Sequence, residues 1–104
     1  MTDVRKAIRI DKWLWQARFF KTRSLAAGVV SGGRLRLNGA RMAKPGRAVG
    51  AGDVLVFPQG GHIRTIRILA PGTRRGPAEE ARALYDDLAP LSQDSVAPMG
   101  GQAE

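Results

Sequence analysis

A change in hydrophobic period between residues 9 and 39 constrains the fold of this chain most strongly. Between residues 10 and 20, apolar side chains recur at the spacing of a helix, and those on one side are Ile10, Trp13, Leu14, Ala17 and Phe20. Residues 34–38 instead alternate polar side chains with leucine, which is the pattern of a strand with one wet face. The sequence therefore predicts short helices first and strands after them.

Two helices are expected before the first strand. Asp11 can cap the first by accepting from exposed backbone N–H groups, and this helix should run to about Phe20. Its other side would carry Lys12, Trp15, Gln16, Arg18 and Phe19. Thr22 is predicted to cap the second helix, and Gly32-Gly33 ends it because glycine accepts the left-handed conformation. The apolar face of the second helix would consist of Leu25, Ala26, Val29 and Val30.

Short strands joined by tight turns are expected to follow. Asn38-Gly39 is a strong signal of a hairpin turn, and residues 44–47 form a further basic turn. Strands are predicted over residues 54–57 and 62–69, with a Gly60-Gly61 turn between them. Arg64 and Arg67 are expected to face solvent from the second of these strands.

A third helix is expected after Pro77, which can serve as its first residue. The side chains that recur at helical spacing there are Ala81, Leu84, Tyr85 and Leu88. We therefore divide the chain into a domain over residues 8–70, a C-terminal helical extension over residues 71–88 and an acidic tail over residues 89–104. The tail is rich in Pro, Gly, Ser and Ala and is predicted to be disordered.

Positive charge is concentrated in the first three quarters of the chain. Lysine and arginine number 17 against 9 acidic residues, which gives a formal net charge of +8 on 104 residues. Residues 1–75 hold 16 of the basic and only 3 of the acidic groups. The positive electrostatic field of such a chain speeds encounter with phosphate backbones, so RNA is the expected partner.

Because cysteine is absent and no apolar run approaches the ~18 residues of a membrane span, we expect a cytoplasmic protein without a thiolate metal site.

Aromatic and hydrogen-bonding side chains lie among the basic residues of the two helices and the hairpin. Arginine grips phosphates through parallel hydrogen bonds, and an aromatic ring can stack on an unpaired base. The predicted RNA contacts are Arg9, Lys12, Trp15, Arg18, Lys21, Thr22, Arg23, Ser24, Gly32, Arg34, Asn38, Lys44 and Arg47. Trp13 is expected in the core, whereas Trp15 and Phe19 either stack on a base or pack against the sheet or the third helix.

Several short motifs together resemble the S4-type RNA-binding domain. In chain order they are Arg9-Ile-Asp-Lys12, Lys21-Thr-Arg-Ser24, Gly32-Gly-Arg34, Leu37-Asn-Gly39, Lys44-Pro45 and Gly52-Asp53. Within that superfamily, residues 11–15 and 17–23 are similar to the heat-shock protein 15 family, as are Arg74-Arg75, Pro77-Ala78 and Ala83-Leu-Tyr85. The resemblance covers roughly residues 8–88.

The resemblance implies an α+β fold in which two helices pack on a small, strongly bent, mostly antiparallel sheet. It also implies that the helices and the following hairpin form an RNA-docking face. Members of the heat-shock protein 15 family associate with the large ribosomal subunit, where they are thought to help rescue subunits that retain a nascent chain attached to tRNA. Relatives often continue into a long basic C-terminal extension, whereas this chain finishes in a short acidic tail, so RNA contacts of those extensions are not carried over.

An enzymatic role is not expected. Asp11, beside Arg9 and Lys12, is more simply a helix cap or an ion-pair partner than a catalyst. His62, the single histidine, follows a Gly-Gly turn with no acid or serine at a suggestive spacing. We therefore predict an RNA-binding factor that needs no cofactor or metal and is a monomer when free. The alternatives are a stand-alone accessory module for RNA modification or tRNA binding, and a protein-interaction module whose basic face meets an acidic partner.

Overall fold

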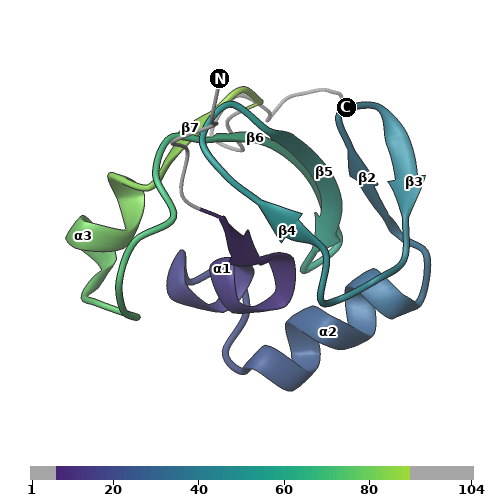
Figure 1. Cartoon of the computed structure of the whole chain (residues 1–104), viewed down its shortest axis with the longest axis horizontal. Helices are drawn as coiled ribbons and strands as arrows, with labels where there is room; N and C mark the ends of the chain where they lie inside the picture. The colour runs from purple at the N-terminus through teal and green to yellow at the C-terminus, as the bar shows by residue number, and fades with distance from the viewer. Residues whose placement is uncertain (1–6, 90–104) are drawn as a thin grey trace.

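A five-stranded antiparallel sheet bends over two short helices in the computed structural model, which describes residues 7–89 (Figure 1). Its strand order is β3-β2-β5-β6-β7, and a separate two-stranded pair joins β1 to β4. The strands are β1 Ile8–Arg9, β2 Leu35–Leu37, β3 Ala40–Met42, β4 Ala48–Val49, β5 Val54–Gln59, β6 His62–Ile68 and β7 Tyr85–Asp87. The helices are α1 Ile10–Gln16, α2 Arg23–Ser31 and α3 Ala78–Arg82. The β2–β3 hairpin and α3 lie at opposite ends of the molecule (Figure 1).

The core lies between α1 and the inner face of the sheet. Trp13 and Leu14 of α1 are fully buried in one cluster with alternate residues of β5 and β6, namely Leu55, Phe57, Ile66 and Ile68. Burial of apolar surface is the dominant favourable term in folding, so this layer holds the helix to the sheet. Trp13 belongs to the core as predicted, and its Nε1–H donates to the carbonyl of Ala70 at 2.9 Å. The predicted α+β fold is confirmed.

Helix α1 ends at Gln16, one turn before the predicted end near Phe20. Arg18 has a φ of +66°, and the N–H of Phe19 donates to the carbonyl of Leu14 at 3.0 Å. This left-handed residue and the bond that follows it form a Schellman-type helix end, in a position where glycine is more usual. The chain therefore reverses at Arg18 instead of continuing as a helix.

The reversal turns Phe19 into the core. The Phe19 ring centroid lies 5.2 Å from that of Phe57 and 4.6 Å from that of Tyr85. Gln16 is also buried, and its Nε2 donates to the carbonyl of Pro71 at 3.0 Å. The prediction that Gln16 and Phe19 lie on the outer side of the helix is wrong, because the sheet and the later chain cover that side. Of the two interpretations of Phe19, packing is confirmed.

Helix α2 begins and ends where the sequence predicts. The Thr22 Oγ1 accepts from the N–H of Leu25 at 3.0 Å, and Gly33 follows the helix with a φ of +76°. The buried face is narrower than expected, however. Ala26 and Val30 are buried, whereas Leu25 is 54% exposed because no element of residues 7–89 covers that side of α2. The cap and the stop are confirmed, and the place of Leu25 in the apolar face is wrong.

The predicted hairpins are confirmed. Asn38 and Gly39 have φ values of +51° and +87°, which match the two left-handed positions of a type I′ turn. Leu35 and Leu37 of β2 are buried while Arg36 between them is exposed. Strands β5 and β6 pair on either side of the Gly60-Gly61 turn.

The predicted third helix is shorter than expected and is followed by a strand. Pro77 is the N-cap residue instead of the first helical residue. Residues 85–87, predicted to be helical, form β7 and pair with β6. Arg64 does not face solvent as predicted, since its side chain is 11% exposed and its Nη2 lies 2.8 Å from Asp87 Oδ2. Pairing with β6 and the Arg64–Asp87 ion pair therefore stabilise a strand at residues 85–87, although the apolar residues there recur at helical spacing. The tail over residues 90–104 lies outside the described residues.

Residues 70–76 fasten the C-terminal extension to the end of α1. The Arg75 Nη1 donates to the carbonyl of Trp15 at 2.6 Å and to that of Phe20 at 2.9 Å. The Trp15 carbonyl also accepts from the N–H of Arg18 at 3.1 Å, so Arg75 adds a charged donor to a carbonyl at the end of α1 and a second bond to the chain just beyond it. Its guanidinium also lies 5.6 Å from the Trp15 ring centroid. Trp15 thus packs against the extension, through Arg75 instead of through the third helix.

We expect Arg75→Ala to lower the free energy of unfolding by about 1–3 kcal/mol, because two carbonyls lose a charged donor. Urea denaturation followed by tryptophan fluorescence measures this change. The control is Arg74→Ala, which removes the same charge from an exposed pair with Glu80 and should change the stability little. Equal destabilisation by the two variants would contradict the role of Arg75.

Candidate nucleic-acid interface

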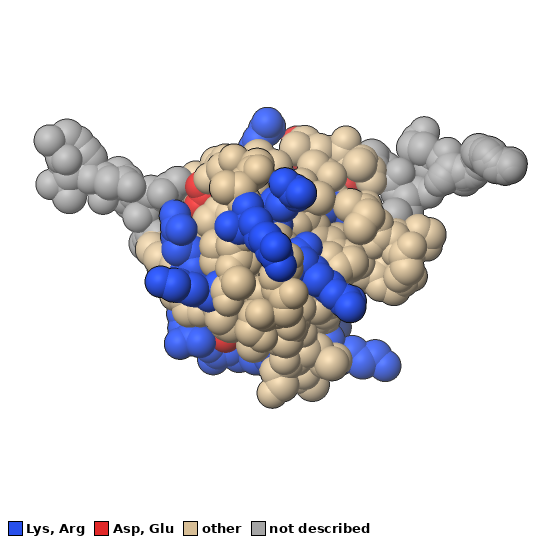
Figure 2. All heavy atoms as spheres, turned by 90° about the vertical axis from the view of Figure 1, so that its right-hand side faces the viewer, with Lys and Arg blue, Asp and Glu red and all other residues tan. Residues whose placement is uncertain are grey.

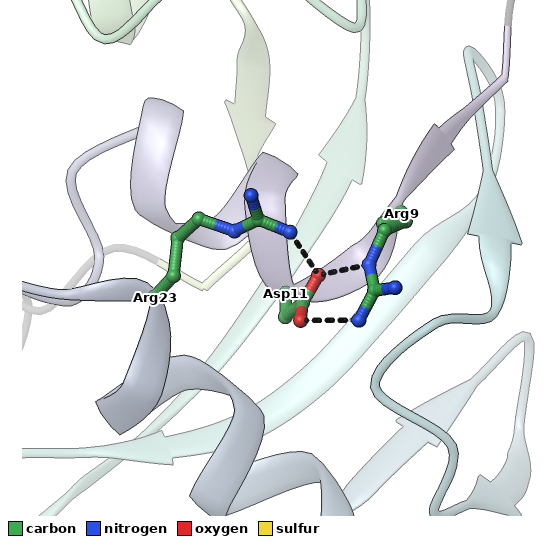
Figure 3. A network of polar contacts seen from close by, with 3 residues as sticks. All are labelled: Arg9, Asp11 and Arg23. Carbon is green, nitrogen blue, oxygen red and sulfur yellow. Dashed lines mark hydrogen bonds and ion pairs between the residues drawn. The ribbon is translucent and has the colours of Figure 1, made fainter.

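One buried carboxylate holds two exposed arginines at the start of α1 (Figure 3). Asp11, which is 4% exposed, accepts from Arg9 Nε at 3.1 Å and Arg9 Nη2 at 2.9 Å, and from Arg23 Nη2 at 3.4 Å. The hydrogen bond from Arg9 is the main cause that holds the pKa of Asp11 below its usual value, against the opposing effect of burial. The ion-pair interpretation of Asp11 is confirmed, and its predicted role as the helix cap is wrong.

The basic turn at residues 44–47 explains why Asp11 does not cap the helix. The N–H of Ile10 donates to the carbonyl of Arg47 at 2.9 Å, and the N–H of Asp11 donates to that of Pro45 at 3.2 Å. Backbone carbonyls thus accept from the first two N–H groups of α1, and the Asp11 side chain pairs with arginine. The same bonds bring the turn to this corner of the fold, where the predicted contacts are Arg9, Arg23, Lys44 and Arg47.

An open groove of about 440 Å³ runs along the exposed side of α2. Ser24, Gly28 and Gly32 recur every four residues, so they share one face of the helix, and the rest of the lining is Leu25, Val29 and Arg34. The structure therefore brings together three predicted contacts, Ser24, Gly32 and Arg34. Their binding of RNA stays a prediction.

Gly28 is a residue of this groove that the sequence interpretation missed. Glycine inside a helix costs about 0.5–1 kcal/mol relative to alanine, so its presence needs a reason. A Cβ at Gly28 would meet no atom within 4 Å, which excludes close packing as that reason. Because Gly28 has no side chain, the groove stays open at this position. The available signal was an isolated glycine between the apolar residues of a predicted helix.

Two further predicted contacts, Lys21 and Thr22, are exposed immediately before α2, and Lys12 is half-buried on α1. Asn38 is occupied within the fold, since its Oδ1 accepts from the N–H of Val54 at 2.8 Å and its Nδ2 donates to Asp53 at 3.1 Å. The side chain of Asn38 therefore ties the hairpin turn to β5.

Trp15 and Arg18 lie toward the C-terminal extension instead of toward the α2 groove. Trp15 is half-buried beside Arg75, and the Arg18 Nε donates to the carbonyl of Gly76 at 2.6 Å. The predicted contacts are thus divided between two regions of the surface.

The face that carries the β2–β3 hairpin and α2 is rich in basic side chains, with few acidic ones visible (Figure 2). Arg36 lies directly opposite Arg41 in the pairing of β2 with β3, and both are exposed. Like charges directly opposite each other destabilise a strand pair, so this placement favours an external anion. Arg41 also donates from Nε to the carbonyl of Gly33 at 3.1 Å. Neither arginine was among the predicted contacts, although the alternation over residues 34–38 indicates that Arg36 faces solvent.

Comparison with known proteins identifies the family. Residues 8–55 match the S4 domain. The chain is 46% identical over 80 residues to the heat shock protein 15 homolog of Aeromonas salmonicida, which covers 77% of this chain and 60% of that protein. A solved trimeric structure of Vibrio cholerae heat shock protein 15 matches with a TM-score of 0.75 and 45% identity, covering 81% of this chain and 84% of that one. The chain belongs to the heat shock protein 15 family.

Membership in the heat shock protein 15 family confirms the predicted resemblance. Escherichia coli strain K12 heat shock protein 15 is 44% identical over 82 residues, which are 79% of this chain and 61% of that protein. The chain thus spans about 60% of the length of these curated relatives. An RQC P-site tRNA stabilizing factor of Halalkalibacterium halodurans is 38% identical over 81 residues, or 76% of this chain and 88% of that protein. The S4 match ends inside β5, so β6, α3 and β7 lie beyond it.

We expect Asp11→Asn to weaken binding of structured RNA several-fold, although it makes the chain more positive by one charge. A neutral amide loses the charged pairing that orients Arg9 and Arg23, and the loss of orientation outweighs the added attraction. Fluorescence anisotropy at fixed salt measures the affinity. Asp86→Asn makes the same charge change on the exposed side of β7 and should leave binding equal or slightly tighter. Tighter binding by Asp11→Asn would show that net charge alone matters.

We expect Gly28→Leu to raise the thermal midpoint while lowering RNA affinity. Leucine favours the helix over glycine by about 0.8–1 kcal/mol, and its side chain enters the open groove. Gly28→Ala is the matched control, because it gains helix stability with only one added methyl group. Calorimetry and anisotropy on the same samples provide the two readings. The groove has no role in binding if both variants bind RNA as tightly as the wild type.

Proposed function

We propose that this member of the heat shock protein 15 family is a non-enzymatic RNA-binding protein that docks on ribosomal RNA of the large subunit. The observation that carries the proposal is the Asp11 cluster beside the open α2 groove. Arginine has five N–H donors, of which Arg9 uses two and Arg23 one in this cluster. The remaining donors are held in place and are available to phosphate oxygens.

The proposed mechanism is recognition of RNA shape. Double-stranded RNA presents phosphates and 2′-hydroxyls across a shallow minor groove, while its major groove is too deep and narrow for side chains to read. The small residues of the α2 groove allow an RNA backbone to approach the helix, and Arg34 lies in the same lining. Arginines at the corner and on the hairpin would neutralise neighbouring phosphates, so phosphate contacts supply most of the affinity.

We further propose that the chain acts on large subunits that retain a nascent chain attached to tRNA, with peptidyl-tRNA as a second RNA partner. Support comes from the relative named as an RQC P-site tRNA stabilizing factor, 88% of whose length this chain covers. This role places the protein in the cytoplasm, where ribosomes work. Within residues 7–89, no helix is long and apolar enough to cross a bilayer.

The proposed role is binding without catalysis. Residues 7–89 contain no group of three or more side chains of the types that ligate metals. The one histidine, His62, is exposed at the start of β6. Asp11, the acidic residue that is buried, is already paired with two arginines.

The oligomeric state is a separate part of the proposal. The Vibrio cholerae relative was solved as a trimer. We propose that the present chain is a monomer when free of RNA, and light scattering after size exclusion measures its mass directly.

We expect the full-length chain to sediment with large subunits that hold peptidyl-tRNA and to bind empty subunits less. If about five phosphates are engaged, the logarithm of the affinity should fall by roughly three to five units per tenfold rise in salt. Ribonuclease treatment should release the chain, whereas a protein partner would retain it. Absence of RNA binding at low salt, or binding that salt does not weaken, would contradict the proposed function.

A further inference from the structure

A hollow of about 200 Å³ lies near α3, at the end of the molecule opposite the β2–β3 hairpin. It forms where the end of α1 meets β6, α3 and β7. The hollow is therefore built jointly by the S4-matched part of the chain and by elements beyond it. It contains neither the Asp11 cluster nor any residue of the α2 groove.

The charged groups that line this hollow are all positive. Arg18, Arg64 and Arg82 contribute guanidinium groups, and no carboxylate is part of the lining. Two nearby acids have partners of their own, since Asp87 pairs with Arg64 and Glu80 pairs with Arg74. Asp87 neutralises Arg64, so Arg18 and Arg82 supply the net positive charge of the lining, which attracts an anion.

Arg18 has a backbone conformation that glycine adopts at lower cost. Its φ of +66° at the end of α1 is the left-handed position of the Schellman-type end described above. The Arg18 Nε donates to the carbonyl of Gly76, and its two Nη groups make no hydrogen bond within residues 7–89. Because glycine would adopt this conformation at lower cost, an arginine here indicates that its side chain has a function.

Other polar groups of the hollow also lack partners within the described residues. The Arg64 Nε is buried and has none, although the two Nη groups of Arg64 bind Gln59 and Asp87. The Arg82 guanidinium and the Tyr85 hydroxyl make no hydrogen bond in this part of the chain. The Arg64 Nε is closed off from the hollow, whereas Arg82 is exposed and Tyr85 is half-buried. A ligand rich in acceptor oxygens would supply partners to the Arg18 Nη groups, the Arg82 guanidinium and the Tyr85 hydroxyl.

The size of the hollow restricts the ligand to a small group. Its volume is below the about 300–1,000 Å³ of sites for drug-sized molecules. Ala17, Ala78 and Ala81 leave the space open, and half-buried Tyr85 adds an aromatic surface. An anion that carries one flat group with hydrogen-bonding edges fits these walls. A nucleotide has this chemistry.

We propose that this hollow binds one unpaired nucleotide of an RNA strand. The phosphate lies between Arg18 and Arg82, and the base lies against the alanines and Tyr85. The inference rests on the proposed RNA-binding function, because the nucleotide would belong to the bound RNA. It adds a second point of contact, at the opposite end of α1 from the Asp11 cluster.

Matched variants of the full chain separate the hollow from the main surface. Ala78→Leu fills the hollow, whereas Ala83→Leu adds the same side chain outside its lining. Arg82→Gln removes a charge from the hollow, and Arg67→Gln removes one from the exposed face of β6.

We expect Arg82→Gln to weaken binding of an RNA hairpin with a single-stranded overhang by about tenfold, the effect of one charge-assisted hydrogen bond. Ala78→Leu should weaken binding of the same RNA to a similar extent because leucine occupies the space of the nucleotide. Affinity for the same hairpin without the overhang should change by less than about twofold on this view. The proposal is overturned if each variant matches its control, or if both RNAs lose affinity equally.

Titration with small probes tests the hollow independently of RNA docking. Uridine 5′-monophosphate should shift the alanine methyl NMR signals of Ala78 and Ala81 in the wild-type chain and not in Arg82→Gln. Equal shifts with inorganic phosphate, or binding of a polyglutamate peptide in place of the nucleotide, would reject a nucleotide site. If the chain binds the nucleotide but no RNA, the nucleotide site is supported and the proposed function is rejected. If the chain binds RNA but the signals of the hollow do not shift, the proposed function is supported and the nucleotide site is rejected.

Discussion

The shortness of α1 is the constraint on which the rest of the structure depends. Four N–H groups at the start and four carbonyls at the end of any helix lack partners inside it, so a helix of seven residues needs many partners from elsewhere. A buried polar group left alone costs about 1–3 kcal/mol. Pro45 and Arg47 supply carbonyls at one end, and Arg75 supplies a donor at the other. These bonds connect segments that are distant in the sequence.

The electrostatics of the Asp11 cluster follow from the same constraint. Because backbone carbonyls accept from the N–H groups of Ile10 and Asp11, the Asp11 carboxylate is not needed for those two donors and can hold Arg9 and Arg23. Without that carboxylate, two guanidinium groups at one corner would repel each other. The buried negative charge therefore allows positive charge to be concentrated beside the α2 groove. What looks like a stabilising ion pair also fixes the direction in which two phosphate-binding groups point.

The sequence correctly predicted structural features that depend on contacts between residues close together in the chain. It failed for features that depend on contacts between distant residues. Thr22 was correctly predicted as a cap because the group it binds lies three residues away. The outer side of the helix was the wrong prediction for Phe19, and a helix was the wrong prediction for residues 85–87, since the first depends on space under β5 and the second on pairing with β6. In the candidate site, the charged residues could be predicted as RNA contacts from their residue type alone. The role of Gly28 could not, because Gly28 contributes by having no side chain.

Several residues depart from local preference, and all of them lie where RNA is proposed to bind. Gly28 weakens a helix, Arg18 takes a glycine conformation, and Arg36 faces Arg41 across two strands. Proteins keep such departures mainly at functional sites, where the cost in stability is offset by what the residue does. Gly28 lies in the α2 groove, Arg36 on the β2–β3 hairpin and Arg18 just after the end of α1. Because tertiary bonds fix both ends of α1, the distance between the Asp11 cluster at its start and the hollow at its end is also fixed. An RNA that contacts both is then selected by the spacing of its backbone and its unpaired nucleotide, without any need to read base sequence.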